Sequence, residues 1–589
     1  MSLRAVLAVP SRSARRLLPA MLVAGLLVAC SFSGSDDDAS APPPTEQPLP
    51  PPPELADITE IHPAGPAPKR PNIVLIMTDD MRADELRYMP QTRRLLGEHG
   101  LRFVNGFAPH PVCCPSRAST LTGQYTHNHK VYAVQEPWGF HSFDDQETVA
   151  TALQRSGYDT LFLGKYLNGY GSQPPPDNSS AESTRYVPPG WSDWRGSIGS
   201  SLPPTDPMAG GTYRYFDMTL NIDGTLVANP RRYSTRLLGD HTVDMIHDWA
   251  PKPKPFFLWV NYVAPHDGLP FEYDDPKPIT TSSGTEIRYE TPAVLKSVRG
   301  RFDGQITPKR LAQIAERDIT DKPQFIRGRA PLSTQQWAAI AESARQRAES
   351  LKIVDAQVLR TVRALRASGE LDNTIIAFTS DNGYFLGEHR LGQGKILPYD
   401  PSLRVPMLIR GPDLPRGQVR RDPFLIIDLA PSFLAAAGAH PRIQVDGQSM
   451  LPIARNGDRG WRRPVLTETG PREVRVTING QRTVQMLPKG FEDPRFSVGL
   501  RTSRYLYVEH ATGERELYDL QRDPHQLNSR VGWPAYRSVQ QQLASVLKRM
   551  RDCAGPDCRV MLPESLWGPA PNGGAPPVSS TRDGRPPGR

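Results

Sequence analysis

The sequence runs Asn72-Ile73-Val74-Leu75-Ile76-Met77-Thr78 and continues directly into Asp79-Asp80. Seven residues without polar alternation favour a strand that is buried on both faces, as in a parallel sheet covered by helices on each side. The two carboxylates follow at the carboxyl end of this strand, which is where open α/β sheets place their sites. The run therefore predicts a buried parallel strand with a polar site at its end.

The alternation of strand and helix continues outward from this run. Strands are expected at 160–163, 256–260, 374–378 and 406–409, and helices at 148–156, 351–365 and 428–437. After about residue 462 the strands become short and alternating, and one more helix is expected near 538–550. This pattern predicts an α/β body followed by a smaller α+β subdomain.

The composition is that of a globular protein, with 38% hydrophobic and 22% charged residues among 589. The formal charge of +8 is spread along the chain and is not gathered into one basic stretch. We therefore expect no nucleic-acid partner, while a basic surface remains compatible with an anionic small substrate or polymer.

The amino-terminal segment has the features of an export signal. Several arginines precede an apolar run at 17–29, which is short for a membrane-spanning helix. The run ends Leu27-Val28-Ala29-Cys30, which resembles the lipobox of bacterial lipoproteins, so we expect a signal peptide at 1–30 and a lipid on Cys30. A plain signal peptide or an uncleaved anchor are the alternatives, and Arg15-Arg16 leaves open whether export is Sec or twin-arginine. We expect an exported, lipid-anchored protein that faces outside the cytoplasm.

Two segments have compositions that cannot bury a core. Residues 31–70 are rich in proline and predict an extended linker, and residues 566–589 predict a disordered tail. The folded part is then a catalytic domain at 71–462 and a C-terminal subdomain at 463–565. Cys553 and Cys558 close a short loop in that subdomain, and in an oxidising compartment we expect a disulfide contributing about 2 kcal/mol.

Three polar clusters are expected at the ends of strands: Asp79-Asp80, Cys113 to Arg117, and Asp381-Asn382. If the three aspartates lie about 5 Å apart, each like-charge pair costs about 3 kcal/mol at an effective dielectric near 20. A divalent cation removes this repulsion, and Asn382 offers a neutral oxygen as a further ligand. Oxygen donors favour Ca²⁺ or Mg²⁺ over zinc.

The segment from Cys113 to Gly123 predicts a short helix, with Pro115 near its start and Gly123 at its end. The amino end of such a helix attracts an anion, and Arg117 in its first turn can bind one with its guanidinium. The alternative is a buried cysteine pair that caps a helix.

This segment, Cys113-Cys114-Pro115-Ser116-Arg117 followed by Leu121-Thr122-Gly123, resembles the active-site signature of the formylglycine-dependent sulfatases. Other segments resemble the same family in the same order across residues 70–560: 72–80, Gly164-Lys165, Pro265-His266, 379–383, 387–392, Lys395, 404–406, and 517–524. The resemblance implies a large mixed sheet flanked by helices, which is the alkaline-phosphatase-like sulfatase fold.

The resemblance also implies a mechanism. Cys113 would be oxidised to formylglycine by a separate maturation enzyme, and the hydrated aldehyde would attack the sulfur of a sulfate ester. One divalent metal, calcium in most of the family, would be held by Asp79, Asp80, Asp381, Asn382 and the modified Cys113. Arg117 would steady the hydrated aldehyde, Lys165 and Lys395 the sulfate oxygens, and His266 would protonate the leaving oxygen.

One departure from the family pattern bears on the substrate. Many arylsulfatases carry a histidine two residues after the Gly-Lys lysine, but this sequence reads Lys165-Tyr166-Leu167-Asn168. That form, with His127-Asn128-His129, resembles the N-acetylglucosamine-6-sulfatase branch, so a sulfated sugar is expected, with a generic aryl sulfate as the alternative. The candidate substrate contacts are His127, His129, Asn168 and His389.

Two further readings of the same residues stay open. The fold could serve a phosphate or phosphonate ester hydrolase, because both chemistries use a metal and a nucleophile. Alternatively the chain could be a surface lipoprotein that binds sulfated polymer without turnover, although such a protein has no need of a nucleophile.

Overall fold

A computed structural model of the chain describes residues 70–567, apart from 136, 181, 200–201, 281–283, 285, 471–472, 479–480 and 487–492, and gives only the backbone of 473–478 and 481–486. The expected leader with Cys30, the linker up to residue 69 and the tail from residue 568 lie outside the described residues.

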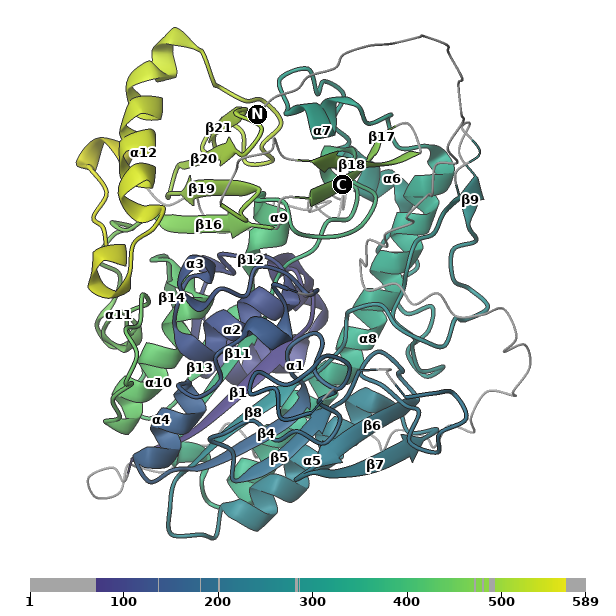
Figure 1. Ribbon diagram of the computed structural model, residues 1–589, viewed down its shortest axis with the longest axis vertical. Coiled ribbons are helices and arrows are strands. Elements are labelled where there is room, and N and C mark those ends of the chain that lie inside the picture. The colour runs from purple at the N-terminus through teal and green to yellow at the C-terminus, as the bar shows by residue number, and fades with distance from the viewer. Residues whose placement is uncertain are drawn as a thin grey trace, which may run out of the picture. The chain divides into compact units, whose positions relative to one another are not determined.

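A ten-stranded mixed sheet forms the centre of the described chain (Figure 1). Its five inner strands β11, β1, β8, β4 and β5 are parallel, whereas β13 and β6 flank them in the antiparallel direction. From edge to edge the strands are β14 (Gln418–Arg420), β2 (Leu101–Phe103), β13 (Met407–Arg410), β11 (Thr374–Ser380), β1 (Asn72–Thr78), β8 (Phe256–Asn261), β4 (Asp159–Lys165), β5 (Asp193–Ser197), β6 (Asp217–Ile222) and β7 (Thr225–Pro230). The large mixed sheet expected from the sequence is confirmed.

Helices cover both faces of this sheet. Successive residues of a strand point to opposite faces, so Ile73 and Leu75 pack with α2 (Cys113–Thr122), α4 (Val149–Arg155) and α10 (Leu429–Ala437). Val74 and Ile76 pack on the other face with α5 (Ser234–Trp249) and α8 (Thr334–Ala367). Burial on both faces explains why β1 is apolar at every central position.

The helix α8 is longer than the sequence pattern predicts, because it begins at Thr334 and not near residue 351. Ser333 caps it, accepting a hydrogen bond from the Gln336 backbone in a capping box. The first half of α8 buries polar side chains, among them Gln346 and Arg347. These residues interrupt the apolar periodicity, which is why the pattern showed only the second half.

The C-terminal part contains an antiparallel sheet of β16 (Val465–Thr469), β19 (Ser497–Arg501), β20 (Tyr505–His510) and β21 (Arg515–Asp519), against which α12 (Arg537–Met550) packs. A hairpin of β17 (Glu473–Ile478) and β18 (Gln481–Met486) lies between β16 and β19 in the chain. Cys553 and Cys558 are joined by a disulfide just after α12.

Short elements complete the described chain. The remaining strands are β3 (Gly106–Phe107), β9 (Ile279–Thr280), β10 (Glu286–Ile287), β12 (Arg404–Val405) and β15 (Phe424–Leu425). The remaining α-helices are α1 (Pro90–Thr92), α3 (Thr126–His129), α6 (Pro308–Leu311), α7 (Gln324–Arg327), α9 (Asp400–Leu403) and α11 (Leu451–Asn456). Within the described ranges, no helix combines the length and apolar character that a membrane crossing requires.

Candidate active site

Four parallel strands end side by side at one edge of the large sheet. Met77 of β1 pairs with Asn261 of β8 and Thr379 of β11, and Asn261 also pairs with Gly164 of β4. This register brings the residues that follow β1, β8 and β11, and Lys165 at the end of β4, to one place. Strand register thus brings together Asp79-Asp80 and Asp381-Asn382. The expected strand end at Cys113 is wrong, because Cys113 begins α2 and reaches the edge from that helix.

Gly164 has a specific steric reason to be glycine. Its φ is +96°, and a Cβ atom there would lie 2.2 Å from the carbonyl oxygen of Asn261. Any larger residue would push β4 away from β8. The Gly-Lys pair therefore lets the lysine leave the strand end while the two backbones stay close.

Cys113 is the first residue of α2, and its side chain points into this edge. Its Sγ lies 3.3 Å from Asp79 Oδ1, 3.7 Å from Asp80 Oδ1 and 2.8 Å from Lys395 Nζ. Burial, and next the charge of Asp79, raise the pKa of the Cys113 thiol to about 11. The thiol is therefore protonated at neutral pH and is a poor nucleophile as it stands.

Asp79 and Asp80 are both buried and ionised. Burial alone would raise their pKa values, but Lys165 and His266 lower the pKa of Asp79 to about 2. The pKa of Asp80 is also lowered, against the effect of burial, chiefly by Lys395. The Lys165 and Lys395 ammonium groups contact Asp79 and Asp80, respectively. Asp80 has a φ of +66°, a conformation uncommon for residues other than glycine.

Asp381 is held by the guanidinium of Arg117. Arg117 Nε donates to Asp381 Oδ2 at 2.8 Å, and its Nη1 donates to the Lys165 carbonyl and to Asn261 Oδ1. Asp381 Oδ1 accepts a hydrogen bond from the Asp80 backbone at 3.0 Å. Arg117 therefore ties the ends of β4, β8 and β11 together, and its Nη2 has no hydrogen-bond partner within the described residues.

The donor atoms at this edge fit a hard cation. One ligand atom each from Asp79, Asp80, Cys113 and His266 lie within 4.8 Å of one another. Asn382 Nδ2 donates to Asp80 Oδ1 at 2.7 Å, while its buried Oδ1 has no hydrogen-bond partner among the described residues. Carboxylate and amide oxygens are the ligands preferred by Ca²⁺ and Mg²⁺.

His266 faces the same carboxylates. Its Nδ1 donates to the Asp267 carbonyl at 2.8 Å, and its Nε2 lies 3.7 Å from Asp80 Oδ2. Burial alone would lower the pKa of His266, but the charges of Asp267, Asp80 and Asp79 raise it well above its ordinary value. The imidazolium form is the proton donor that a leaving oxygen requires.

Arg347 supports this edge from α8 and was not predicted. It forms a two-point ion pair with Glu85 at 2.8 and 2.7 Å, and its Nη2 donates to the Asp80 carbonyl at 2.6 Å. Its Nη1 donates to the carbonyl of Pro265 at 3.4 Å. A single buried side chain thus fixes the backbone next to both Asp80 and His266, although nothing local in the sequence marks it.

The other candidate contacts lie in different surroundings. Asn168 reaches the edge, where its Nδ2 donates to the hydroxyl of Tyr213, a residue that the sequence did not single out. His129 bonds Ser119 inside the core, and His389 bonds Glu316 at 2.9 Å with its ring over Tyr399. The structure does not bring His129 or His389 into contact with Cys113.

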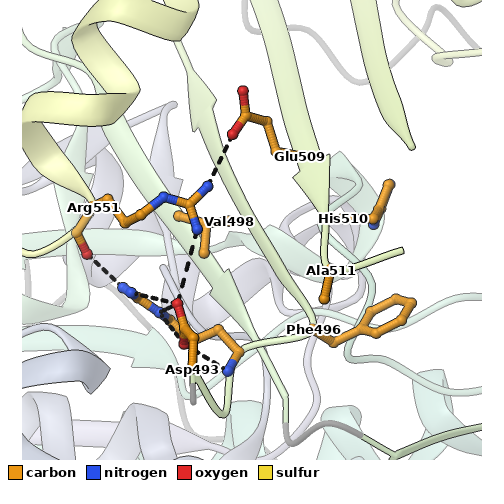
Figure 2. Close-up of a pocket in the computed structure, with 8 residues that line it drawn as sticks. Asp493, Phe496, Val498, Glu509, His510, Ala511 and Arg551 are labelled. Carbon is orange, nitrogen blue, oxygen red and sulfur yellow. Dashed lines mark hydrogen bonds and ion pairs between the residues drawn. The ribbon is translucent and has the colours of Figure 1, made fainter. Parts of the chain in front are cut away.

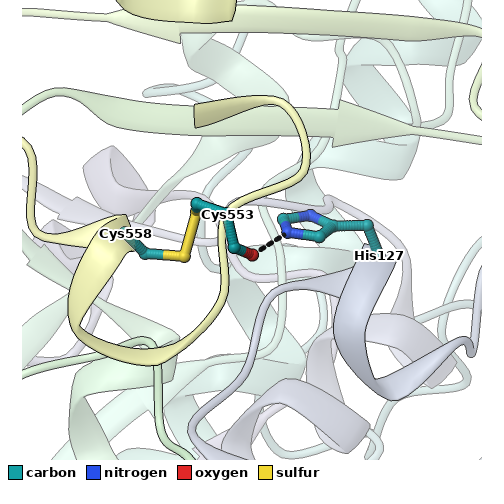
Figure 3. A group of neighbouring side chains, drawn as sticks. All are labelled: His127, Cys553 and Cys558. Carbon is teal, nitrogen blue, oxygen red and sulfur yellow. Dashed lines mark hydrogen bonds between the residues drawn. A yellow bond between two sulfur atoms is a disulfide. The ribbon is translucent and has the colours of Figure 1, made fainter. Parts of the chain in front are cut away.

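His127 points toward the disulfide (Figure 3). Its Nε2 lies 2.7 Å from the Cys553 carbonyl and its Nδ1 lies 2.8 Å from Glu468. Although His127 and the two cysteines form a compact group, both sulfur atoms are used in the Cys553–Cys558 bond. This group therefore lacks thiolate ligands for a metal.

A cavity of about 280 Å³ lies on the C-terminal sheet (Figure 2). Its floor includes Phe496 and Val498, and Arg551 at its wall pairs with Glu509 at 2.9 Å and with Asp493 at 3.8 Å. These charged groups are paired across the wall of the cavity, so they do not form a binding site of one sign.

Comparisons with known proteins agree on one family. Residues 71–439 match the Sulfatase family model. The chain is 30% identical over 540 residues to an N-acetylglucosamine-6-sulfatase of Capra hircus, covering 84% of this chain and 85% of that protein. It is 31% identical over 406 residues to an extracellular sulfatase of Drosophila melanogaster, but spans only 32% of that protein's length.

Solved structures share the fold at lower identity. One, a complex with D-glucosamine-2-N,6-O-disulfate, has a TM-score of 0.57 at 22% identity and covers 82% of this chain and 98% of its own. A phosphonate monoester hydrolase of Agrobacterium radiobacter has a TM-score of 0.56 at 21% identity, covering 82% and 95%. At these identities the likeness concerns the fold.

Proposed function

This chain belongs to the sulfatase family of sulfuric ester hydrolases, and from that premise we propose that it hydrolyses sulfate esters of sugars with a nucleophile made from Cys113 and a bound divalent cation. The observation that carries the proposal is the placement of Cys113 Sγ 3.3 Å from Asp79 and 3.7 Å from Asp80, both fully buried. A buried, protonated thiol among carboxylates suits a precursor better than a thiolate nucleophile.

The nucleophile is formylglycine, produced from Cys113 by a separate maturation enzyme. Its support is the position of Cys113 at the amino end of α2, beside the carboxylates and Lys395. The conversion replaces the thiol by an aldehyde and makes the peptide about 18 Da lighter. Mass spectrometry of the Cys113 peptide from active enzyme tests this directly, and an active enzyme that carries only unmodified cysteine would contradict it.

The cation is Ca²⁺ or Mg²⁺, held by Asp79, Asp80, Asp381 and Asn382. The buried, unpaired Asn382 Oδ1 and the three neighbouring carboxylates support this ligand set. A bound cation supplies Lewis acidity, lowering the pKa of an attacking hydroxyl and polarising the sulfuryl group.

The chain's own residues then divide the remaining work. Lys165 and Lys395, which flank Asp79 and Asp80, bind sulfate oxygens. His266 donates the Nε2 proton to the leaving sugar oxygen, and its Nδ1 bond to Asp267 fixes the ring for that task. Arg117 acts by holding Asp381 in position, because its guanidinium is bonded to Asp381 and to two strand ends.

The substrate is a glucosamine 6-sulfate or a closely similar sulfated sugar. The goat relative is an N-acetylglucosamine-6-sulfatase that aligns over most of both chains. A panel of glucosamine, galactosamine and aryl sulfates tests the proposal, with released sulfate as the readout. A higher kcat/KM for a simple aryl sulfate than for every sulfated sugar would overturn the assignment of a sugar substrate. It would not contradict the hydrolysis of sulfate esters.

A phosphate or phosphonate ester hydrolase is the second candidate, favoured by the fold shared with the phosphonate monoester hydrolase. Comparing kcat/KM for the sulfate and phosphate esters of one alcohol decides between the two. A higher kcat/KM for the phosphate ester would select this second function.

The site of action is outside the cytoplasm, on a lipid anchor at Cys30. The disulfide between Cys553 and Cys558 supports an oxidising compartment. Membrane fractionation of Cys30→Ser tests the anchor: release of the variant into the soluble fraction is expected, whereas unchanged membrane association would contradict it.

A further inference from the structure

Tyr213 lies against two of the groups that the proposed function assigns to catalysis. The centre of its ring is 4.6 Å from the centre of the His266 imidazole, with an angle of 36° between the planes. The Lys165 ammonium lies 5.0 Å from the same ring centre. Tyr213 belongs to the segment between β5 and β6, which holds none of the segments noted above for their resemblance to the family.

The hydroxyl of Tyr213 is oriented by Asn168. Asn168 Nδ2 donates to Tyr213 Oη at 2.8 Å. The phenol oxygen accepts in this bond, and a phenol can donate its own hydrogen as well as accept one. Tyr213 and Asn168 are half-buried, while Asp79, Cys113 and Arg117 are fully buried. The pair is therefore more accessible than the carboxylates and Cys113 beside it.

The position two residues after Lys165, where many arylsulfatases carry a histidine, cannot supply a polar group in this chain. It is Leu167, which is 3% exposed and packs in the core on the α2 face of the sheet. The next residue, Asn168, turns back toward the edge and meets Tyr213. The polar group near this position thus comes from a different segment of the chain.

The backbone fixes Tyr213 relative to His266. The Leu269 amide donates to the Tyr213 carbonyl at 2.8 Å, and the Tyr215 hydroxyl donates to the His266 carbonyl at 2.7 Å. Gly268 allows this approach, because a Cβ atom there would lie 2.4 Å from the Tyr213 carbonyl oxygen. Hydrogen bonds to the backbone carbonyls of both Tyr213 and His266 therefore hold the two rings beside each other.

We propose that Tyr213, oriented by Asn168, contacts the substrate by donating a phenol hydrogen bond to a sulfate oxygen beside Lys165. This inference rests on the proposed function, and it adds a residue for which the sequence pattern has no counterpart. A hydrogen bond from a neutral donor to an anion, in a site shielded from water, has a measurable effect on binding and on rate.

The test uses full-length enzyme in which conversion of Cys113 has been shown by mass spectrometry. Tyr213→Phe keeps the ring over Lys165 and His266 and removes only the hydroxyl. We expect kcat/KM to fall about 10- to 100-fold and inorganic sulfate to bind more weakly by a similar factor. The matched control is Tyr158→Phe, which removes a hydroxyl that donates to the Pro71 carbonyl. Tyr158 precedes β4, about 20 Å from Lys165 at the rise of a β-strand, and both quantities should stay unchanged.

Asn168→Ala should produce a smaller loss than Tyr213→Phe, and the double variant should be no worse than Tyr213→Phe alone, since both act through one hydroxyl. Unchanged sulfate affinity in Tyr213→Phe would overturn the inference. So would a shifted pH profile of kcat/KM with unchanged sulfate affinity, because Tyr213 would then act only through His266.

Sulfate binding also separates this inference from the proposed function. Wild-type enzyme that binds inorganic sulfate but does not hydrolyse sulfate esters would refute the function, and Tyr213→Phe could still weaken the binding. Wild-type enzyme that neither binds nor hydrolyses would refute both.

Discussion

The carboxyl edge of the large sheet and the junction around Glu468 both bury charged groups beside a histidine and a cysteine. At the junction, Glu468 Oε1 pairs with His127 and with Arg495, and His127 also bonds the Cys553 carbonyl. At the sheet edge, three carboxylates converge with an amide oxygen that has no hydrogen-bond partner among the described residues.

The difference between the two clusters lies in where their polar atoms point. The groups of the junction bond segments from distant parts of the chain, α3, β16 and the disulfide loop, so its charges stabilise the fold. The groups of the sheet edge point toward a common place that half-buried Asn168 and Tyr213 border. Buried charge alone therefore does not identify a site. The feature that separates the sheet edge is the convergence of several donor atoms, one of them the unpaired Asn382 Oδ1, on one place.

The largest expected difference between the two clusters is in the effect of replacing their cysteines. Cys113→Ala should reduce turnover by at least about 10⁴-fold, because it removes the nucleophile, while the melting temperature stays near that of the wild type. The paired change Cys553→Ser with Cys558→Ser should leave kcat/KM intact and cost about 2 kcal/mol of stability, from loop entropy. Kinetics and thermal unfolding on both variants measure this, and turnover in Cys113→Ala within about 10-fold of the wild type would refute the role of Cys113.

Removal of the cation should affect only the sheet edge. Chelation should abolish activity, and adding back Ca²⁺ or Mg²⁺ at about 100 times its dissociation constant should stabilise the fold by about 2.7 kcal/mol. Glu468→Gln should show the same cation-dependent gain as the wild type, since the junction binds no metal. Thermal unfolding with and without cation tests this, and equal stability in both conditions for the wild type would contradict the metal site.

Loss of the junction's central charge should affect stability and spare catalysis. Glu468→Gln leaves the buried His127 without its carboxylate and removes one of the carboxylates that pair with Arg495. Breaking a buried ion pair in this way costs about 3 kcal/mol. Denaturant unfolding should show that loss, with kcat/KM unchanged at temperatures where the variant is folded. A selective loss of kcat/KM would mean that the junction contributes to the site.

The smallest expected effect is a pH dependence of the junction's contribution. Burial alone would lower the pKa of His127, but Glu468 raises it, so its stabilisation is complete below the unfolded value of 6.5 and is lost as pH rises through the folded pKa. The pKa of Glu468 is lowered by His127 against the effect of burial, so its share is lost as pH falls below the unfolded value of 4.5. The stability difference between wild type and His127→Asn should therefore be largest between these two pH values. A difference that does not vary with pH would contradict a charged His127.

Much of the fold was predictable, because the buried strands β1, β8 and β11 are continuous apolar runs and Gly123 ends α2 in a left-handed conformation. The segments carrying Cys113, Asp79-Asp80 and Asp381-Asn382 were also visible, since each is a compact cluster of polar residues next to a recognisable element. The first half of α8 was missed, because its buried Gln346 and Arg347 conceal the apolar face.

The sequence by itself determined the α/β class, the family and the residues proposed for the chemistry, because these depend on local patterns and on a short contiguous motif. Only the tertiary structure decided that Arg347 holds Asp80, that His127 belongs to Glu468 and that Tyr213 meets Asn168, Lys165 and His266. The two residues of each of these pairs lie 45 to 341 positions apart in the sequence. Contacts of that kind arise from strand register and packing, which bring together residues that no local pattern relates.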